Sequence, residues 1–482
     1  MKKLNKLVAL LLVVMLITGC SKTDKGPGGD TSFDELPAMT EEEITLTVAT
    51  WQQPSLKQAL KDGFEAKYPN ITIELVEVDG EAWMDSLTNL ASAGNLPDVF
   101  WYQADIAVPI RNGWLGDLTP YWNADPETAD VLDTLKDQGV LPMVDGTEKK
   151  LAASVAYQPF TIFLDENLFS RFNVDMPSSD WKWSEMIALQ QEMTIPEAGI
   201  FGYNTYTLPL TMSPIVNGDA VGEFGWDGEK YDLTGYWAEA LQQHADYVQA
   251  GVHAPFFDTD EAEAAFGDRL LWSASSGRIA MQLDAWWTKT LFSTPEFVDK
   301  GIKWVPYPVP QGDNAQTLNK PAFVDFGSIS PASDYPREAY EALKWFGWGA
   351  DGWEVKLNHF ATATLENGEK EFPFPDGLPM VKKASLWDGV KSQINDKLTA
   401  DGNADQIHYY ESFLDNVKHP IPLGGSIHPG FQTFLVEQYF EGEYGNVEAE
   451  TVADNLRAAD IAADLTNKLN EIREETLAEL FD

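Results

Sequence analysis

The first folded stretch of the chain alternates strand and helix patterns, and no other feature of the sequence restricts the fold as much. Strand patterns cover residues 41–51, 71–78 and 96–102. Helical spacing connects them over 54–68 and 81–94, where apolar residues recur about four positions apart. Strands that alternate with helices predict an α/β fold with a parallel sheet.

Ligands of such sheets bind beyond the carboxyl ends of the strands. Two of the predicted strands end in an aromatic ring followed by an amide, and a third predicted strand, 279–283, is followed by an acid and two rings. The residues are Trp51, Gln52, Gln53, Trp101, Tyr102, Gln103, Asp284, Trp286 and Trp287. We expect these three clusters to supply candidate ligand contacts.

Aromatic residues make up 12% of the chain, and most of them must be core, because large rings dominate apolar burial. A ring held in a cleft can instead stack on the apolar face of a sugar, while neighbouring acids and amides bind the hydroxyl groups around its edge. The clusters at the strand ends offer both kinds of group. They therefore point to carbohydrate recognition, with core packing as the alternative for any single ring.

The amino-terminal region resembles the export signal of a bacterial lipoprotein. Three lysines precede an apolar run from Leu7 to Ile17, too short for a spanning helix. The run ends in Ile17-Thr18-Gly19-Cys20, which resembles a lipobox whose cysteine is lipidated. We expect a signal peptide over 1–19, and lipidated Cys20 with a flexible tether over 20–43. Cys20 is the only cysteine in the chain, so no thiol is left for disulfides, catalysis or metal binding.

Charge and motifs exclude several classes of function. The formal net charge of −43 opposes binding to nucleic acid. Residues 347–352 match G-x-G-x-x-G, but a helix precedes them and Asp351 would repel phosphate, so we do not expect a nucleotide site. The chain has no P-loop, no G-x-S-x-G and no H-E-x-x-H. We expect neither a cofactor nor a bound metal, whereas a glycosidase-like pair of carboxylates stays open.

Five segments, taken in order, resemble one known family. They are ASAGNLPDVF (91–100), RNGWLGDLTPY (111–121), WKWSEM (181–186), SSGRIAMQLDAWW (275–287) and FGSISPASDYPREAYEALKWF (326–346). The family is that of the extracellular solute-binding proteins of ABC importers, in the maltose-binding-like group that carries sugars. The resemblance spans nearly the whole chain after the signal.

The resemblance implies a type II periplasmic-binding-protein fold, in which two α/β lobes joined by hinge crossovers clamp a ligand. We expect crossings near Ala152 to Phe160, near Lys320 to Phe323, and after the helix that ends at 346–348. The implied amino-terminal lobe comprises 44–155 and 321–365, and the carboxyl-terminal lobe comprises 156–320 and 366–482. With the strand-end clusters, the ligand-facing candidates are Trp51, Gln52, Gln53, Trp101, Tyr102, Tyr157, Asp284, Trp286, Trp287, Asp325, Ser426 and His428.

The implied function is capture of a carbohydrate, most simply an oligosaccharide, by lobe closure. Delivery would be to permease subunits in the membrane, powered by a separate ATPase. The resemblance places a monomeric, lipid-anchored, non-enzymatic protein at the outer face of a bacterial cytoplasmic membrane. A binding protein for a peptide or polyamine is one alternative, and a surface-anchored glycoside hydrolase or lyase is another. Closure on an unaltered ligand would separate binding from catalysis.

Two features depart from the family pattern. Leu164-Asp165 stands where the family usually has Tyr-Asn, and Ile279 replaces a small residue. Sequence from about 365 to 420 is additional, and the pattern does not place it; an extension of the cleft for a longer saccharide is one interpretation.

Overall fold

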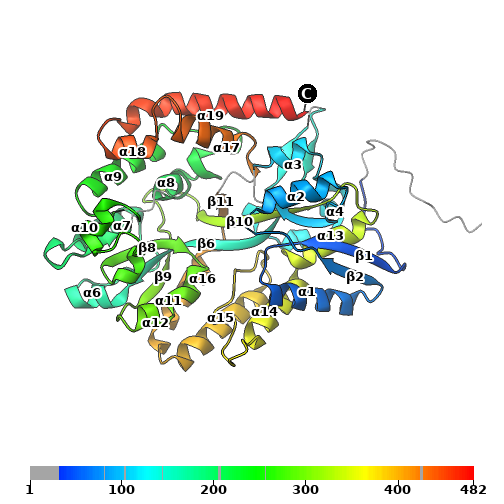
Figure 1. The fold of residues 1–482 in the computed structure, drawn as a ribbon, viewed down its shortest axis with the longest axis horizontal. Coiled ribbons are helices and arrows are strands. Elements are labelled where there is room, and N and C mark those ends of the chain that lie inside the picture. The colour runs from blue at the N-terminus through cyan, green and yellow to red at the C-terminus, as the bar shows by residue number, and fades with distance from the viewer. Residues whose placement is uncertain are drawn as a thin grey trace, which may run out of the picture.

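The structure, a computed structural model, describes residues 32–80, 82–102, 105–143, 145–204, 208–255, 257–423 and 427–481. Figure 1 shows two lobes side by side, with two long strands running across the middle. The signal peptide and Cys20 lie outside the described residues. No helix within the described ranges combines the length and the apolar character needed to cross a membrane.

One large mixed sheet runs through both lobes in the order β2-β1-β3-β10-β6-β8-β7, with β11 beside β10 and β9 beside β6. A separate hairpin pairs β4 with β5. The strands are β1 (Ile44–Ala49), β2 (Ile71–Leu75), β3 (Val99–Tyr102), β4 (Val140–Pro142), β5 (Glu148–Lys150), β6 (Ala153–Asp165), β7 (Phe201–Tyr203), β8 (Ile279–Ala285), β9 (Trp304–Pro308), β10 (Lys320–Ile329) and β11 (Pro420–Leu423).

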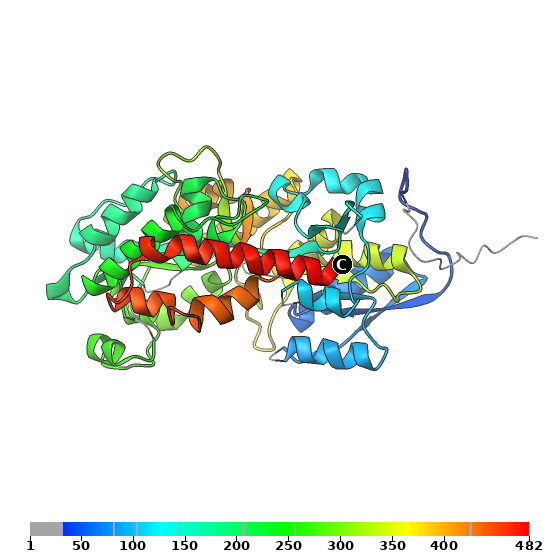
Figure 2. The same ribbon diagram turned by 90° about the horizontal axis from the view of Figure 1, so that it is seen from above.

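Helices cover the sheet in both lobes (Figures 1 and 2). Those before the second crossing are α1 (Pro54–Lys67), α2 (Trp83–Ser92), α3 (Ala107–Arg111), α4 (Thr119–Ala124), α5 (Asp133–Lys136), α6 (Glu166–Phe172), α7 (Trp183–Glu192), α8 (Leu208–Gly218), α9 (Tyr236–Gln249), α10 (Asp260–Phe266), α11 (Thr288–Phe292) and α12 (Pro295–Val298). Those after it are α13 (Pro336–Phe346), α14 (Ala350–Thr362), α15 (Ala384–Ala400), α16 (Ile407–Asn416), α17 (Phe431–Phe434), α18 (Val447–Val452) and α19 (Ala458–Phe481).

The first lobe confirms the parallel arrangement expected from the sequence. β1 pairs in parallel with β2 on one side and with β3 on the other. The face of α1 that carries Leu56, Leu60 and Phe64 is buried, as its four-residue spacing predicts. Because parallel strands end at one edge of a sheet, Trp51 and Trp101 come together there.

Two strands belong to both lobes and form the hinge. The first half of β6 pairs with β10, and its second half, from Phe160 onward, pairs with β8 and β9 of the second lobe. One end of β10 pairs with β11, and the other end pairs with β3 of the first lobe. The pairing of β6 with β10 shifts register between Asp325 and Phe326. A β-bulge of this kind changes the direction of a side chain. Here it occurs at Asp325, which lines a pocket between the lobes.

The additional sequence after residue 365 packs against both lobes. Between 372 and 417 its apolar residues belong to the same buried cluster as β1 to β3. On the other side, Tyr409 of α16 contacts Tyr307 of β9, with ring centroids 5.6 Å apart. The family pattern left this segment unplaced, and its hydrophobic contacts join it mainly to the core that contains β1 to β3.

Part of the expected tether is packed on the first lobe. The ring of Phe33 lies 5.5 Å from that of Tyr121. The guanidinium of Arg337 donates a 2.9 Å hydrogen bond to the carbonyl of Pro37, and the backbone N–H of Thr40 donates one of 2.6 Å to Glu338. A free tether is therefore not observed over residues 33–40.

Candidate functional site

A pocket of about 460 Å³ opens where the hinge strands pass between the lobes. Its walls come from the loop after β1, the end of β3, the hinge strands, the loop after β8, α14 and the loop before α15. The lining residues are Trp51, Gln52, Gln53, Leu56, Trp101, Ala156, Tyr157, Gln158, Trp287, Phe323, Asp325, Trp353, Lys356, Asp376 and Gly377. This volume is within the usual range for small-molecule sites.

The first-lobe wall of the pocket is built around the half-buried ring of Trp51. This ring packs edge-on against Trp83 and Trp101, with centroids 5.1 Å and 5.0 Å away. Its indole N–H donates a 3.0 Å hydrogen bond to Oδ2 of Asp325. Trp83 in turn donates to the backbone carbonyl of Trp101 at 2.9 Å. The packed neighbours and the hydrogen bond together fix the orientation of the ring.

The second-lobe wall presents a more exposed ring. The side chain of Trp287 is 46% exposed, and its ring lies 4.8 Å from that of Phe323 on β10. Phe323 is itself packed on Phe160 at 4.4 Å. Large rings therefore face the pocket from both lobes.

Side chains of the hinge strand β6 alternate between its two faces beside the pocket. Ala156 and Gln158 are half-buried on one face, whereas Tyr157 between them is buried and its hydroxyl donates to the carbonyl of Val417. The amide of Gln158 donates a 3.1 Å hydrogen bond to Oδ1 of Asp376. Gly377 has φ +88°, and a Cβ added there would lie 3.4 Å from the carbonyl oxygen of Tyr157. The positive φ, which L side chains rarely adopt, is the reason that a glycine suits this turn beside the hinge.

Two carboxyl groups and one lysine line the pocket: Asp325, Asp376 and Lys356. Loss of hydration, together with the charge of Asp376, raises the pKa of Asp325 to about 6, although the hydrogen bond from Trp51 opposes the shift. Burial lowers the pKa of Lys356 to about 7. The ammonium of Lys356 donates a 2.9 Å hydrogen bond to the carbonyl of Gly347 and lies 4.8 Å from the centre of the Trp353 ring. The pocket can therefore offer both charged and neutral polar groups to a ligand.

Several polar atoms of pocket-lining residues have no hydrogen-bond partner among the described residues. They are Nε1 of Trp101, Nε1 of Trp353 and Oε1 of Gln158. Buried polar atoms in native structures are nearly always paired. No group of three or more His, Cys, Asp or Glu side chains in the described ranges is arranged to hold a metal ion.

Comparison with known proteins decides the family. The family model for bacterial extracellular solute-binding proteins matches residues 48–347. The chain belongs to this family. The matched region contains both hinge strands and eleven of the fifteen residues that line the pocket.

Solved structures of other solute-binding proteins share the two-lobed type II fold. An ABC substrate-binding protein from Listeria monocytogenes in complex with cycloalternan has a TM-score of 0.60 at 16% identity, over 89% of this chain and 99% of that one. The cyclic alpha-maltosyl-1,6-maltose binding protein from Arthrobacter globiformis has a TM-score of 0.62 at 17% identity, over 89% and 99%. A sugar transporter protein from Rhizobium etli, in an open conformation, scores 0.64 at 14%, over 88% and 98%. At these identities the likeness establishes the fold.

In this solute-binding protein, seven of the twelve candidates named from the sequence line the pocket. They are Trp51, Gln52, Gln53, Trp101, Tyr157, Trp287 and Asp325. Asp284 lies on β8 next to this wall, where its carboxylate accepts a 2.8 Å hydrogen bond from the backbone N–H of Ala285. Ser426, like Gln103, lies outside the described residues.

Three candidates are core residues instead. Trp286 is 1% exposed, its ring is stacked on Phe413, and its indole N–H donates to the carbonyl of Pro375. Tyr102 is also buried. His428 packs among aromatic residues of the second lobe, and burial lowers its pKa to about 4. These three do not line the pocket, because tertiary packing rather than position at a strand end decides where each side chain points.

Sequence reasoning missed the pocket residues that come from distant segments: Gln158, Phe323, Trp353, Lys356 and Asp376. Two of them carried a usable signal. Gln158 and Phe323 each stand on a hinge strand. The period-2 alternation places Phe323 on the same face as the predicted Asp325, and Gln158 on the face opposite to Tyr157. Trp353, Lys356 and Asp376 follow the second crossing, and nothing local marks them as pocket residues.

Proposed function

We propose that this solute-binding protein captures a carbohydrate between its lobes, an oligosaccharide rather than a single sugar. It would hand the ligand to permease subunits of an ABC importer that a separate ATPase powers. The observation that carries the proposal is the hinge pocket, which has aromatic rings on both walls and amides, carboxylates and a lysine around them. Rings suit the C–H face of a sugar, and the polar groups suit its hydroxyls.

The chemistry of the pocket supports this choice over a peptide or a polyamine. Two carboxylates are accompanied by a lysine and three amide side chains, a mixture suited to a neutral, hydroxyl-rich ligand. The similar protein from Listeria is in complex with cycloalternan, and the one from Arthrobacter is a cyclic alpha-maltosyl-1,6-maltose binding protein. Both are consistent with this proposal.

Closure supplies the mechanism. A ligand that contacts Trp51 on one lobe and Trp287 on the other stabilises the closed form selectively, because only that form offers both rings at once. The binding free energy shifts the population about the hinge strands, with no covalent step. We further propose that Cys20 carries a lipid, so that a monomeric protein remains at the outer face of the cytoplasmic membrane.

The test is a titration of intrinsic tryptophan fluorescence in the chain without residues 1–20, against a panel of mono- and oligosaccharides. We expect a saturable change with at least one oligosaccharide, which chromatography afterwards recovers unaltered. Cleavage of the sugar would replace the proposal by the hydrolase or lyase alternative. If no sugar in the panel changes the fluorescence but a peptide or polyamine does, the proposed class of ligand is wrong.

A single substitution connects the response to the pocket. Trp51→Ala is expected to weaken binding of the best sugar tenfold or more, roughly the loss of 1.4 kcal/mol or above for a central aromatic contact. The control is Trp122→Ala, which removes a half-buried tryptophan of the first lobe that does not line the pocket. Isothermal titration calorimetry gives both affinities, and equal losses in the two variants would contradict the assignment of Trp51.

A further inference from the structure

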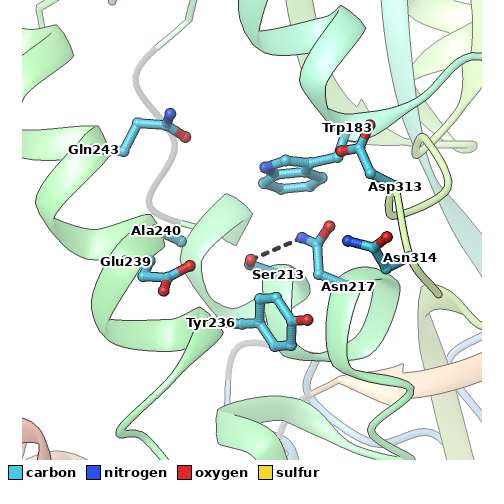
Figure 3. A pocket seen from close by; sticks show the side chains of 9 residues that line it. All are labelled: Trp183, Ser213, Asn217, Tyr236, Glu239, Ala240, Gln243, Asp313 and Asn314. Carbon is cyan, nitrogen blue, oxygen red and sulfur yellow. Dashed lines mark hydrogen bonds between the residues drawn. The ribbon is translucent and has the colours of Figure 1, made fainter.

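A second pocket lies entirely within the second lobe (Figure 3). It has a volume of about 260 Å³ and is formed by the start of α7, the second half of α8, the first half of α9 and the loop after β9. It shares no lining residue with the hinge pocket. Its volume is slightly below the roughly 300–1,000 Å³ usual for drug-sized ligands, so it suits one ring-sized group.

Two aromatic rings bound this pocket. Figure 3 shows the indole of Trp183 on one side and the phenol ring of Tyr236 on the other, with Asn217 and Asn314 at one flank and Glu239 and Gln243 at the opposite flank. Trp183 is half-buried and Tyr236 is 41% exposed. The two rings suit the apolar C–H faces of a pyranose ring, and the polar groups between them suit its hydroxyl groups.

The ring of Tyr236 is held in place by a glycine. Gly218 ends α8, and a Cβ added there would lie 2.7 Å from Cδ2 of Tyr236. The ring therefore rests directly on the backbone of α8. Any side chain at position 218 would displace it, which provides a way to move the ring without removing it.

The backbone of Trp183 and the adjoining loop are held by hydrogen bonds as well. The backbone N–H of Trp183 donates to the carbonyl of Gln311 at 2.8 Å. Ser184 donates to the carboxylate of Asp313 at 2.5 Å, and the N–H of Gly312 donates to the carbonyl of Val216 on α8 at 2.8 Å. The loop is thus tied to both α7 and α8, so the pocket is organised before any ligand enters.

Polar groups in the pocket are available to a ligand. Asn217 donates one amide hydrogen to Ser213 at 3.0 Å. The side chains of Asn314, Glu239 and Gln243 have no hydrogen-bond partner among the residues that the structure describes. These three free polar side chains surround a slot between two rings, where they can bond to the hydroxyl groups at the edge of a sugar ring.

We propose that this pocket is a second carbohydrate site, which binds one pyranose unit of a glycan between Trp183 and Tyr236. It acts independently of lobe closure, since every wall belongs to one lobe. The site would allow the protein to hold a glycan at its surface while the hinge pocket remains free for the transported ligand.

The test removes the hinge pocket first. In the chain without residues 1–20 that carries Trp51→Ala and Trp287→Ala, saturation-transfer NMR is recorded with the methyl glycosides of glucose, galactose, mannose and xylose. We expect at least one glycoside to retain saturation transfer. Loss of transfer for every glycoside in this background would overturn the proposal, since binding would then belong to the hinge pocket alone.

Further variants locate the remaining signal. Tyr236→Ala and Gly218→Ala are each expected to weaken the retained binding by about three- to tenfold, the range of one aromatic contact. Tyr236→Phe keeps the ring and should keep the affinity. The control Phe440→Ala removes a ring of the same lobe that is 42% exposed and should have no effect. An affinity unchanged in both Tyr236→Ala and Gly218→Ala would overturn the assignment.

Discussion

Replacing Trp286 by alanine is expected to lower the free energy of unfolding by about 3–5 kcal/mol, the usual cost of truncating a buried tryptophan. The ring is 1% exposed and stacked on Phe413, with centroids 5.2 Å apart and an interplanar angle of 10°. Its indole N–H donates a 3.0 Å hydrogen bond to the carbonyl of Pro375, which the substitution would leave unpaired. Denaturant unfolding followed by circular dichroism measures the change.

The neighbouring Trp287 provides the matched control. Its side chain is 46% exposed at the pocket wall, so Trp287→Ala should change the unfolding free energy by less than about 1 kcal/mol. It should nevertheless weaken ligand binding, whereas Trp286→Ala should leave the affinity of the folded protein within a few-fold of the original. The opposite pattern, with binding lost at 286 and stability lost at 287, would show that the two rings had been assigned the wrong way round.

The second large expected effect is a dependence of the unfolding free energy on pH, caused by the carboxyl group of Asp325. Its pKa in the folded protein is about 6, above the ordinary value of 3.8, so the folded state binds the proton more tightly than the unfolded state. The protonated carboxyl therefore makes its full contribution to the free energy of unfolding below about pH 4. This contribution is lost as the pH rises through 6. At pH 7 the full shift would cost about 3 kcal/mol, and partial exposure of the side chain reduces this to about 1–2 kcal/mol.

Asp325→Asn should consequently unfold at higher denaturant concentration than the original protein at pH 7, with the difference vanishing near pH 4. The amide oxygen can still accept the hydrogen bond from Trp51, so the ring should stay in place. Ligand affinity should fall in the same variant, because a charged acceptor is lost from the pocket. The control is Asp62→Asn, which removes an acid from the exposed face of α1, outside the pocket. A pH-independent gain at 325 would contradict the argument.

The sequence allowed the architecture and one wall of the pocket to be predicted, for physical reasons that particular residues illustrate. Trp51 and Trp101 end neighbouring parallel strands, and such strands must end at the same edge of the sheet. Apolar spacing over four residues placed Leu56, Leu60 and Phe64 inside. The order of family-like segments then indicated two lobes and two strands crossing between them.

The remaining walls depended on contacts that local patterns do not encode. Trp286 and Trp287 are adjacent, and only the packing of Phe413 of α16 against one of them decides which points into the core. Lys356 reads as an ordinary helical lysine, yet α14 buries it beside the pocket. Asp376 belongs to the additional segment after residue 365. Hydrophobic contacts with both lobes determine where that segment lies. Long-range packing, rather than propensity, determined each of these outcomes.

The contribution of β10 and of residues 372–417 to the first lobe has a consequence for how the chain is made. β3 of that lobe ends at Tyr102, but its partner β10 begins only at Lys320, and the buried cluster is completed by residues up to Val417. At a synthesis rate of roughly 5–20 residues per second, about 15–60 s pass between these points. Throughout that interval the nascent chain has no complete hydrophobic core for its first lobe. The first lobe is therefore expected to reach its folded state only after most of the polypeptide has been synthesised.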